Sequence, residues 1–125
     1  MSQKILIVED EVALSEVLKD KMIHEGYEVE TAKNGLEGLQ AVKNNPPDLI
    51  LMDVLMPVMD GMTALNELKK DEKTSKIPVI ILSNMSDSQD VTKAMQYNTF
   101  DYLIKSDISL EAVLDKVRSK LGPNK

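Results

Sequence analysis

Apolar and polar positions along this chain form a pattern that predicts five strands, each followed by a helix. Continuous apolar runs are typical of strands covered on both faces, whereas apolar residues spaced three and four apart indicate a helix. Glycines and prolines separate these segments. The predicted strands cover residues 4–8, 27–31, 49–52, 79–82 and 100–104.

Five helices are expected after these strands, each with one apolar face. The residues predicted to face the core are Ala13, Leu14, Val17, Leu18 and Met22, then Leu36, Leu39 and Val42, then Met62, Leu65 and Leu68, then Val91, Ala94 and Met95, and finally Leu110, Val113, Leu114, Val117 and Leu121. Strands that alternate with helices predict a parallel sheet with helices on both faces. We therefore predict an α/β fold with a doubly wound five-stranded parallel sheet, whose three most apolar strands lie at its centre.

Length and composition narrow the class of protein. The 125 residues have the size of one domain, 1–125, and no apolar run is long enough for a membrane span. The N-terminus has no signal-peptide pattern, so we expect a cytoplasmic protein. The lack of cysteine excludes disulfides and thiolate metal sites. A formal net charge of -6 and an aromatic content of 3% argue against direct binding of nucleic acid by this domain.

Polar side chains follow four of the predicted strands, at the point where each strand ends. Glu9 and Asp10 come after the first strand, Asp53 after the third, Ser83 after the fourth and Lys105 after the fifth. The carboxyl ends of parallel strands share one edge of a sheet, and ligands bind at that edge where the strand order reverses. We therefore expect these side chains to converge in one site.

The chemistry of this group indicates phosphoryl transfer. The carboxylates of Glu9, Asp10 and Asp53 would repel one another unless positive charge compensates them. Lys105 together with Mg²⁺, which prefers oxygen ligands, would balance the three negative charges. A carboxylate nucleophile, a metal ion, an ammonium group and the Ser83 hydroxyl are the parts that such a transfer uses. Asp53, on the middle strand, is the candidate phosphoryl acceptor.

The same residues carry a resemblance to a known family. Residues 7–11 (IVEDE), residues 52–61 (MDVLMPVMDG), Ser83 after an apolar strand and residues 101–105 (DYLIK) stand in order at the predicted strand ends. With these features the chain resembles, over essentially its full length, the receiver domain of bacterial two-component response regulators, of the single-domain chemotaxis-regulator type. The resemblance implies a flavodoxin-like fold with strand order 2-1-3-4-5.

The resemblance also implies roles for the acidic residues. Asp53 would accept a phosphoryl group from the phosphohistidine of a sensor histidine kinase or a histidine phosphotransfer protein. Glu9, Asp10 and Asp53 would hold Mg²⁺, directly or through water, together with the backbone carbonyl of Leu55. Such a chain would be a signalling switch and not a turnover enzyme.

Three further residues would transmit the signal. By the resemblance, Lys105 would pair with one phosphoryl oxygen, and the Ser83 hydroxyl would donate to another. Tyr102 would swing inward as Ser83 is drawn to the phosphate. The face formed by the fourth helix, the fifth strand and the fifth helix would then change and control a downstream protein, an output domain or a phosphorylation-dependent homodimer.

The chain departs from the family pattern at four positions. Asn84 stands where the family usually has alanine, and its larger side chain would obstruct the inward path of Tyr102. Ser106 stands where the family typically has a proline after a cis bond, and a cis bond before a non-proline residue costs about 3 kcal/mol. Asn98-Thr99 replaces Gly-Ala before the fifth strand. Phosphorylation is still expected, whereas the usual switching route is in question.

Other interpretations stay open. Asp53 alone fits a structural turn residue, and residues 9–11 fit a charge cluster at a helix N-terminus. A degenerate receiver that binds partners without phosphorylation fits the departures from the family. A Mg²⁺-dependent phosphohydrolase would carry two aspartates separated by one residue after the first strand, and a flavin carrier would have a Ser/Thr/Gly phosphate loop there. The acids in that place fit both of these classes poorly.

Overall fold

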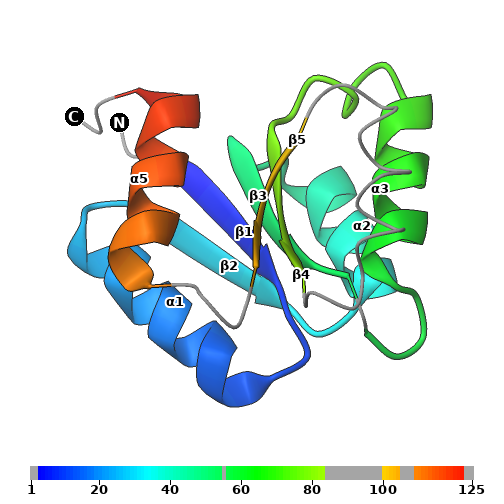
Figure 1. Ribbon diagram of the computed structural model, residues 1–125. Helices are drawn as coiled ribbons and strands as arrows, with labels where there is room; N and C mark the ends of the chain where they lie inside the picture. The colour runs from blue at the N-terminus through cyan, green and yellow to red at the C-terminus, as the bar shows by residue number, and fades with distance from the viewer. Residues whose placement is uncertain (1–2, 55, 84–99, 105–108, 123–125) are drawn as a thin grey trace.

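A computed structural model describes residues 3–54, 56–83, 100–104 and 109–122 of the chain (Figure 1). The helices and strands follow the predicted order. They are β1 (Lys4–Val8), α1 (Val12–His24), β2 (Glu28–Ala32), α2 (Gly35–Asn44), β3 (Leu49–Asp53), α3 (Gly61–Lys70), β4 (Val79–Ser83), β5 (Phe100–Ile104) and α5 (Leu110–Leu121). The predicted helix around Val91, Ala94 and Met95 lies outside the described residues. Among the helices that are described, none is long and apolar enough to cross a lipid bilayer.

The strands form one parallel sheet in the order β2-β1-β3-β4-β5, which confirms the predicted doubly wound, flavodoxin-like α/β topology. The strands with continuous apolar runs, β1, β3 and β4, are the central ones. Side chains alternate between the two faces of a strand, so Leu6 and Val8 of β1 point into one layer, and Ile5 and Ile7 into the other. β2 begins one residue later than predicted, because the N–H of the preceding tyrosine still donates to a carbonyl of α1.

Helices α2 and α3 cover one face of the sheet, and α1 and α5 cover the other (Figure 1). The core beneath α2 and α3 comprises Leu6, Val8, Ala32, Val42, Ile50, Met52, Val54, Ala64, Leu65, Leu68, Val79 and Ile81. The core beneath α1 and α5 comprises Ile5, Ile7, Leu18, Met22, Tyr27, Leu49, Leu51, Ile80, Leu82, Val113, Leu114 and Val117. Full burial of one such large aliphatic side chain contributes about 1.5–3 kcal/mol. These two layers therefore fix the central strands and the positions of their ends.

The outward faces of α1 and α2 differ from the prediction. Ala13 and Val17 of α1 are exposed, and Ser15 is buried in their place. The buried face of α1 is therefore rotated toward Ser15, which the apolar spacing alone does not reveal. Leu36, in the first turn of α2, is 42% exposed. The predicted inward residues of α3 and α5 are buried or half-buried, as expected.

Ion pairs tie α5 to α1 at the surface. The Lys21 ammonium lies 2.7 Å from a carboxylate oxygen of Glu111, and the Arg118 guanidinium lies 2.7 Å from one of Glu25. The hydrogen bond between Lys21 and Glu111 raises the pKa of Lys21 and lowers the pKa of Glu111. Exposed pairs of this kind contribute little to stability, so the apolar layer remains the main support of α5.

Candidate functional site

The chain adds strands to one side of β1 first and then to the other side, so the strand order reverses at β1. The acidic residues lie at the carboxyl ends of β1 and β3, beside this reversal. β2 lies on one side of β1 and β3 on the other, and ligands of open α/β sheets bind at such reversals. Val8 of β1 pairs with Met52 of β3. β1 then continues into Glu9, while β3 ends at Asp53. Two neighbouring apolar strands thus deliver acids to the same edge of the sheet.

The connection between β1 and α1 positions two of the acids by short contacts. The N–H of Glu9 donates to the carbonyl of Ala32 at 3.0 Å, which extends the contact between β1 and β2 by one residue. The Glu9 carboxylate oxygen Oε1 accepts the N–H of Glu11 at 3.1 Å. As a result the Glu9 side chain is turned inward and is 2% exposed, whereas Asp10 is exposed.

Asp53 is the last residue of β3, so the strand runs one residue further than predicted. Its side chain is 4% exposed, and its Oδ1 accepts the N–H of Val54 at 2.8 Å. The N–H of Val54 also lies 3.2 Å from the carbonyl oxygen of Leu82 in β4. These contacts hold the Asp53 carboxylate at the end of a buried strand.

The three acids converge. One carboxylate oxygen from each of Glu9, Asp10 and Asp53 lies within 4.8 Å of the other two. Negative charges this close repel one another, so the group favours a cation. All the donors are oxygens, and Mg²⁺ binds oxygen at about 2.1 Å in octahedral geometry, which sets adjacent ligands about 3.0 Å apart and opposite ligands about 4.2 Å apart. The acids therefore fit one Mg²⁺ ion after a small movement or through a bridging water.

Two glycines bring helix starts against the loop that follows Asp53. A Cβ atom on Gly61 would overlap the carbonyl oxygen of Asp53, and the Gly61 N–H donates to the carbonyl of Val54 at 2.8 Å. A Cβ atom on Gly35 would lie 2.7 Å from the carbonyl oxygen of Met59, and the Gly35 N–H donates to the same oxygen at 2.8 Å. The sequence indicates no role for these glycines at the site, because a glycine after a helix-capping residue does not reveal what it contacts.

The same loop contains a strained turn. Val58 has a φ of 68°, a region that β-branched residues rarely adopt, and its side chain is 78% exposed. The N–H of Met59 donates to the carbonyl of Pro57 at 2.7 Å and closes a three-residue γ-turn around Val58. Backbone strain of this kind clusters at functional sites. No role for Val58 was predicted from the sequence, because valine carries no signal for a positive φ.

The remaining predicted site residues are placed only in part. Ser83 is the last residue of β4, the strand next to β3, so its backbone lies at the same edge as the acids. Tyr102 lies within β5, beside β4. The positions that lie outside the described residues are Leu55, Asn84, Asn98, Thr99, Lys105 and Ser106.

The fold and the site together define a class of protein, namely a doubly wound parallel α/β domain with three acids beside the strand reversal. Residues 5–118 match the sequence model of the response regulator receiver domain. The chain belongs to the family of response regulator receiver domains, which are signalling domains of two-component systems.

Individual relatives agree with this assignment. The chemotaxis protein CheY of Bacillus subtilis is 37% identical over 117 residues, which cover 90% of this chain and 96% of CheY. The DNA-binding regulator RpaA of Synechocystis is 34% identical over 118 residues, which cover 94% of this chain and 48% of RpaA. The chain likewise spans about half the length of the other transcriptional regulators that it matches.

A solved structure provides a further comparison. The receiver domain of a sensor histidine kinase from Pseudomonas aeruginosa has a TM-score of 0.86 to this chain at 27% identity, over 98% of this chain and 99% of that one. That receiver holds a magnesium ion coordinated in its active-site cleft.

Proposed function

We propose that this chain is a phospho-acceptor switch in which Asp53 takes a phosphoryl group from a sensor histidine kinase or a histidine phosphotransfer protein. The observation that carries the proposal is the convergence of Glu9, Asp10 and Asp53 within 4.8 Å at the strand reversal. Phosphoryl transfer depends on positioning and on compensation of negative charge, and a cation-binding acidic group beside a fixed carboxylate supplies both.

The proposed reaction is a displacement at phosphorus. A carboxylate oxygen of Asp53 attacks the phosphorus of the donor phosphohistidine, so a P–O bond forms while the P–N bond breaks. The imidazole leaves with the electron pair of the P–N bond and takes up a proton, and Asp53 becomes an acyl phosphate. The hydrogen bond from the Val54 N–H to Oδ1 at 2.8 Å orients the carboxylate for this attack.

We expect the reaction to depend on Mg²⁺. Glu9, Asp10 and Asp53 would hold the ion, directly or through water, with the backbone carbonyl of Leu55 as a further ligand. When bound, the ion would offset the negative charge of the phosphoryl oxygens. The magnesium ion in the active-site cleft of the Pseudomonas receiver supports this assignment.

We assign the conformational change that follows phosphorylation to residues near β4 and β5. Ser83 and Lys105 would bind phosphoryl oxygens, and Tyr102 would move inward when Ser83 does. The face made of the predicted fourth helix, β5 and α5 would then change and control a downstream protein, an output domain or a homodimer. We place this signalling in the cytoplasm, with residues 1–125 acting as one domain that binds neither nucleic acid nor membrane directly.

The test is phosphorylation by a small donor. The chain is incubated with phosphoramidate and Mg²⁺, and its intact mass is measured. We expect a gain of one phosphoryl group that is lost in Asp53→Asn and when the metal is chelated. Asp60→Asn removes a carboxylate at the end of the same loop and keeps a good helix-capping side chain, so this variant should still gain the group.

Two outcomes would contradict the proposal. If the folded chain gains nothing in the presence of Mg²⁺, it is a degenerate receiver that acts as an interaction module without phosphorylation. If Asp53→Asn still gains the phosphoryl group, the acceptor is another residue.

A further inference from the structure

The methionines of this chain divide into two groups by their exposure. The chain has eight methionines and no cysteine, so the thioethers are its only sulfur atoms. Among the residues that the structure describes, Met22 and Met52 are 0% and 1% exposed. Met56, Met59 and Met62 are only partly buried. Oxidants from the solvent therefore reach the second group and not the first.

The three partly buried methionines lie around the loop that follows Asp53. Met56 and Met59 belong to this loop, and Met62 lies in the first turn of α3. All three pack against the apolar core beneath α2 and α3. We call them the loop methionines. Their side chains combine access to solvent with a structural contact, so a change at their sulfur atoms has structural consequences.

Met59 connects the loop to the start of α2. Its carbonyl oxygen accepts the N–H of Gly35 at 2.8 Å, and its own N–H donates to the carbonyl of Pro57 at 2.7 Å. Its Cγ atom lies 3.0 Å from the point where a Cβ atom on Gly35 would stand. The side chain and the backbone of Met59 therefore both contact the first residue of α2.

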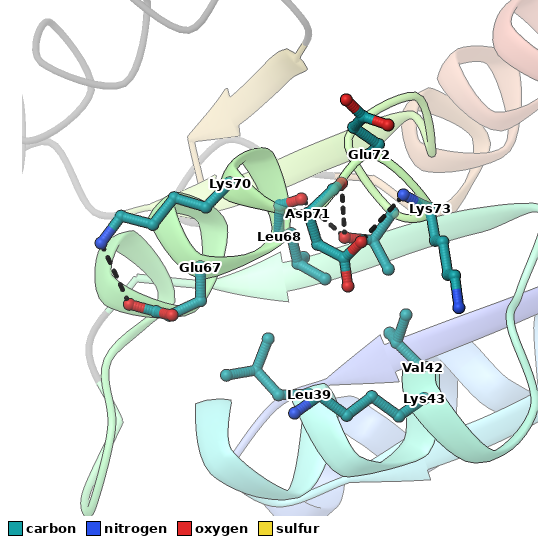
Figure 2. Close-up of a pocket in the computed structure, with 10 residues that line it drawn as sticks. Leu39, Val42, Lys43, Glu67, Leu68, Lys70, Asp71, Glu72 and Lys73 are labelled. Carbon is teal, nitrogen blue, oxygen red and sulfur yellow. Dashed lines mark hydrogen bonds and ion pairs between the residues drawn. The ribbon is translucent and has the colours of Figure 1, made fainter.

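The two ends of the α2–α3 pair differ in polarity. The C-terminal halves of these helices border a concave region that is lined mostly by charged side chains (Figure 2). The N-terminal ends meet the loop through Gly35, Gly61 and the apolar side chains of the loop methionines. A new polar group is therefore easily accommodated at the first end and disruptive at the second.

We propose that the loop methionines form an oxidation site, at which a peroxide converts Met59 to the sulfoxide. A lone pair on the Sδ atom attacks one peroxide oxygen, so an S–O bond forms as the O–O bond breaks. The hydroxide that leaves takes up the proton of the transferred oxygen and departs as water. Sulfur loses two electrons in this step, and the peroxide gains them.

The sulfoxide changes what the Met59 side chain can pack against. The S–O group is strongly polar, and placing it against the apolar core without a hydrogen-bond donor is costly. The oxidised side chain would turn toward solvent and give up its contact with Gly35. The loop between Asp53 and Gly61 would then loosen, and phosphorylation of Asp53 would slow. Only this last effect rests on the proposed function.

The first test is exposure of the folded chain to dilute hydrogen peroxide, with the sulfoxide at each methionine measured by fragmentation mass spectrometry of proteolytic peptides. We expect the loop methionines to oxidise about tenfold faster than Met22 and Met52, because susceptibility follows exposure. In urea, where the chain is unfolded, these five should oxidise at similar rates. Equal rates for Met52 and Met59 in the folded chain would overturn the proposal.

The second test is thermal denaturation before and after peroxide. The Tm of the wild type should fall by about 4 °C on oxidation, and methionine sulfoxide reductases should restore it. Met59→Leu keeps a similar volume and has no sulfur at this position, so its Tm should fall far less. Met22→Leu, at a buried methionine, is the matched control and should show the same fall as the wild type. An equal fall in both variants would overturn the role of Met59.

Phosphorylation by phosphoramidate separates this proposal from that of the phospho-acceptor switch. The oxidised wild type should lose most of its phosphorylation rate, whereas oxidised Met59→Leu should keep the rate that it has before oxidation. An unchanged rate in the oxidised wild type would show that Met59 does not support the acceptor. If the untreated chain gains no phosphoryl group, the proposed function fails, while the oxidation pattern and the Tm shift still decide whether the oxidation site exists.

Discussion

The two connections that bring the acids together are built in different ways. Between β1 and α1 the chain turns within residues 9–11, and Glu9 itself accepts the N–H of Glu11. Between β3 and α3 the chain takes residues 54–60, with a positive φ at Val58 and a glycine packed on the Asp53 carbonyl. In the first connection a site residue, Glu9, sets the backbone of the turn. In the second connection the backbone is set by Val58 and Gly61, which support the site residue Asp53.

This difference shows where the geometry of the site is vulnerable. Substitutions in the first connection should mainly change the charge at the site, because few residues set its backbone. Substitutions in the second should move Asp53 or alter stability even where they remove no charge, because its backbone depends on close packing and on strain. Matched changes in the two connections can test this contrast.

The largest effect is expected from Gly61→Ala. The added Cβ would overlap the carbonyl oxygen of Asp53, and backbone atoms on both sides have little room to move. We expect the free energy of unfolding in urea to fall by about 3 kcal/mol, the upper end of the usual cost of overpacking. Phosphorylation by phosphoramidate should also slow, because Asp53 is displaced.

The matched change in the first connection is Val12→Ala. Val12 begins α1 as Gly61 begins α3, but its side chain is 69% exposed. We expect a change in unfolding free energy within about 0.5 kcal/mol, as is usual for surface substitutions. Similar losses in Val12→Ala and Gly61→Ala would remove the contrast between the two connections.

The sequence predicts those parts of the fold that depend on the spacing of apolar residues and on the parallel arrangement of the strands. Continuous apolar runs such as residues 5–8 and 49–52 are typical of central strands, because a central strand is covered on both faces. Parallel strands bring their carboxyl ends to one edge of the sheet. With β1 beside β3 in the observed strand order, these rules account for the meeting of Glu9, Asp10 and Asp53.

The part that sequence does not predict depends on contacts between backbones. Val17 has the spacing of a core residue yet is 46% exposed, because helix rotation is set by packing against the sheet. Val58 adopts a positive φ against its own preference, and the surrounding loop imposes it. The close approach of Gly61 to Asp53 is visible only in three dimensions.

The second effect in size concerns the proposed Mg²⁺ site, which would take acids from both connections. If the folded chain binds Mg²⁺ there and the unfolded chain does not, Mg²⁺ at ten times its dissociation constant should raise the unfolding free energy by about 1.4 kcal/mol. Asp10→Asn and Asp53→Asn should each abolish most of this increase in a thermal denaturation assay. Glu11→Gln changes an acid outside the converging group and should keep it. A full increase in Asp10→Asn would show that Asp10 is not a metal ligand.

The third effect comes from the helix cap that ends the second connection. The Asp60 carboxylate accepts the N–H of Thr63 at 2.8 Å, whereas α1 has no side-chain cap of this kind. Asp60→Ala should lower the unfolding free energy by about 1 kcal/mol, while Asp60→Asn, which can still cap, should change it little. An equal loss in both variants would show that charge and not capping matters there.

The smallest of the main effects is that of Val58→Gly, the only one of these substitutions that is expected to be stabilising. Glycine adopts a positive φ without the steric cost that valine bears there, although the unfolded chain gains freedom at the same time. The net result should be an increase of about 0.5 kcal/mol in the unfolding free energy, measured in urea. Val12→Gly is the matched change at an exposed valine in a helical conformation, and it should be destabilising by a few tenths of a kcal/mol. Opposite signs for these two exposed valines would locate stored strain in the second connection, and a loss of stability in Val58→Gly would show that the turn is not strained.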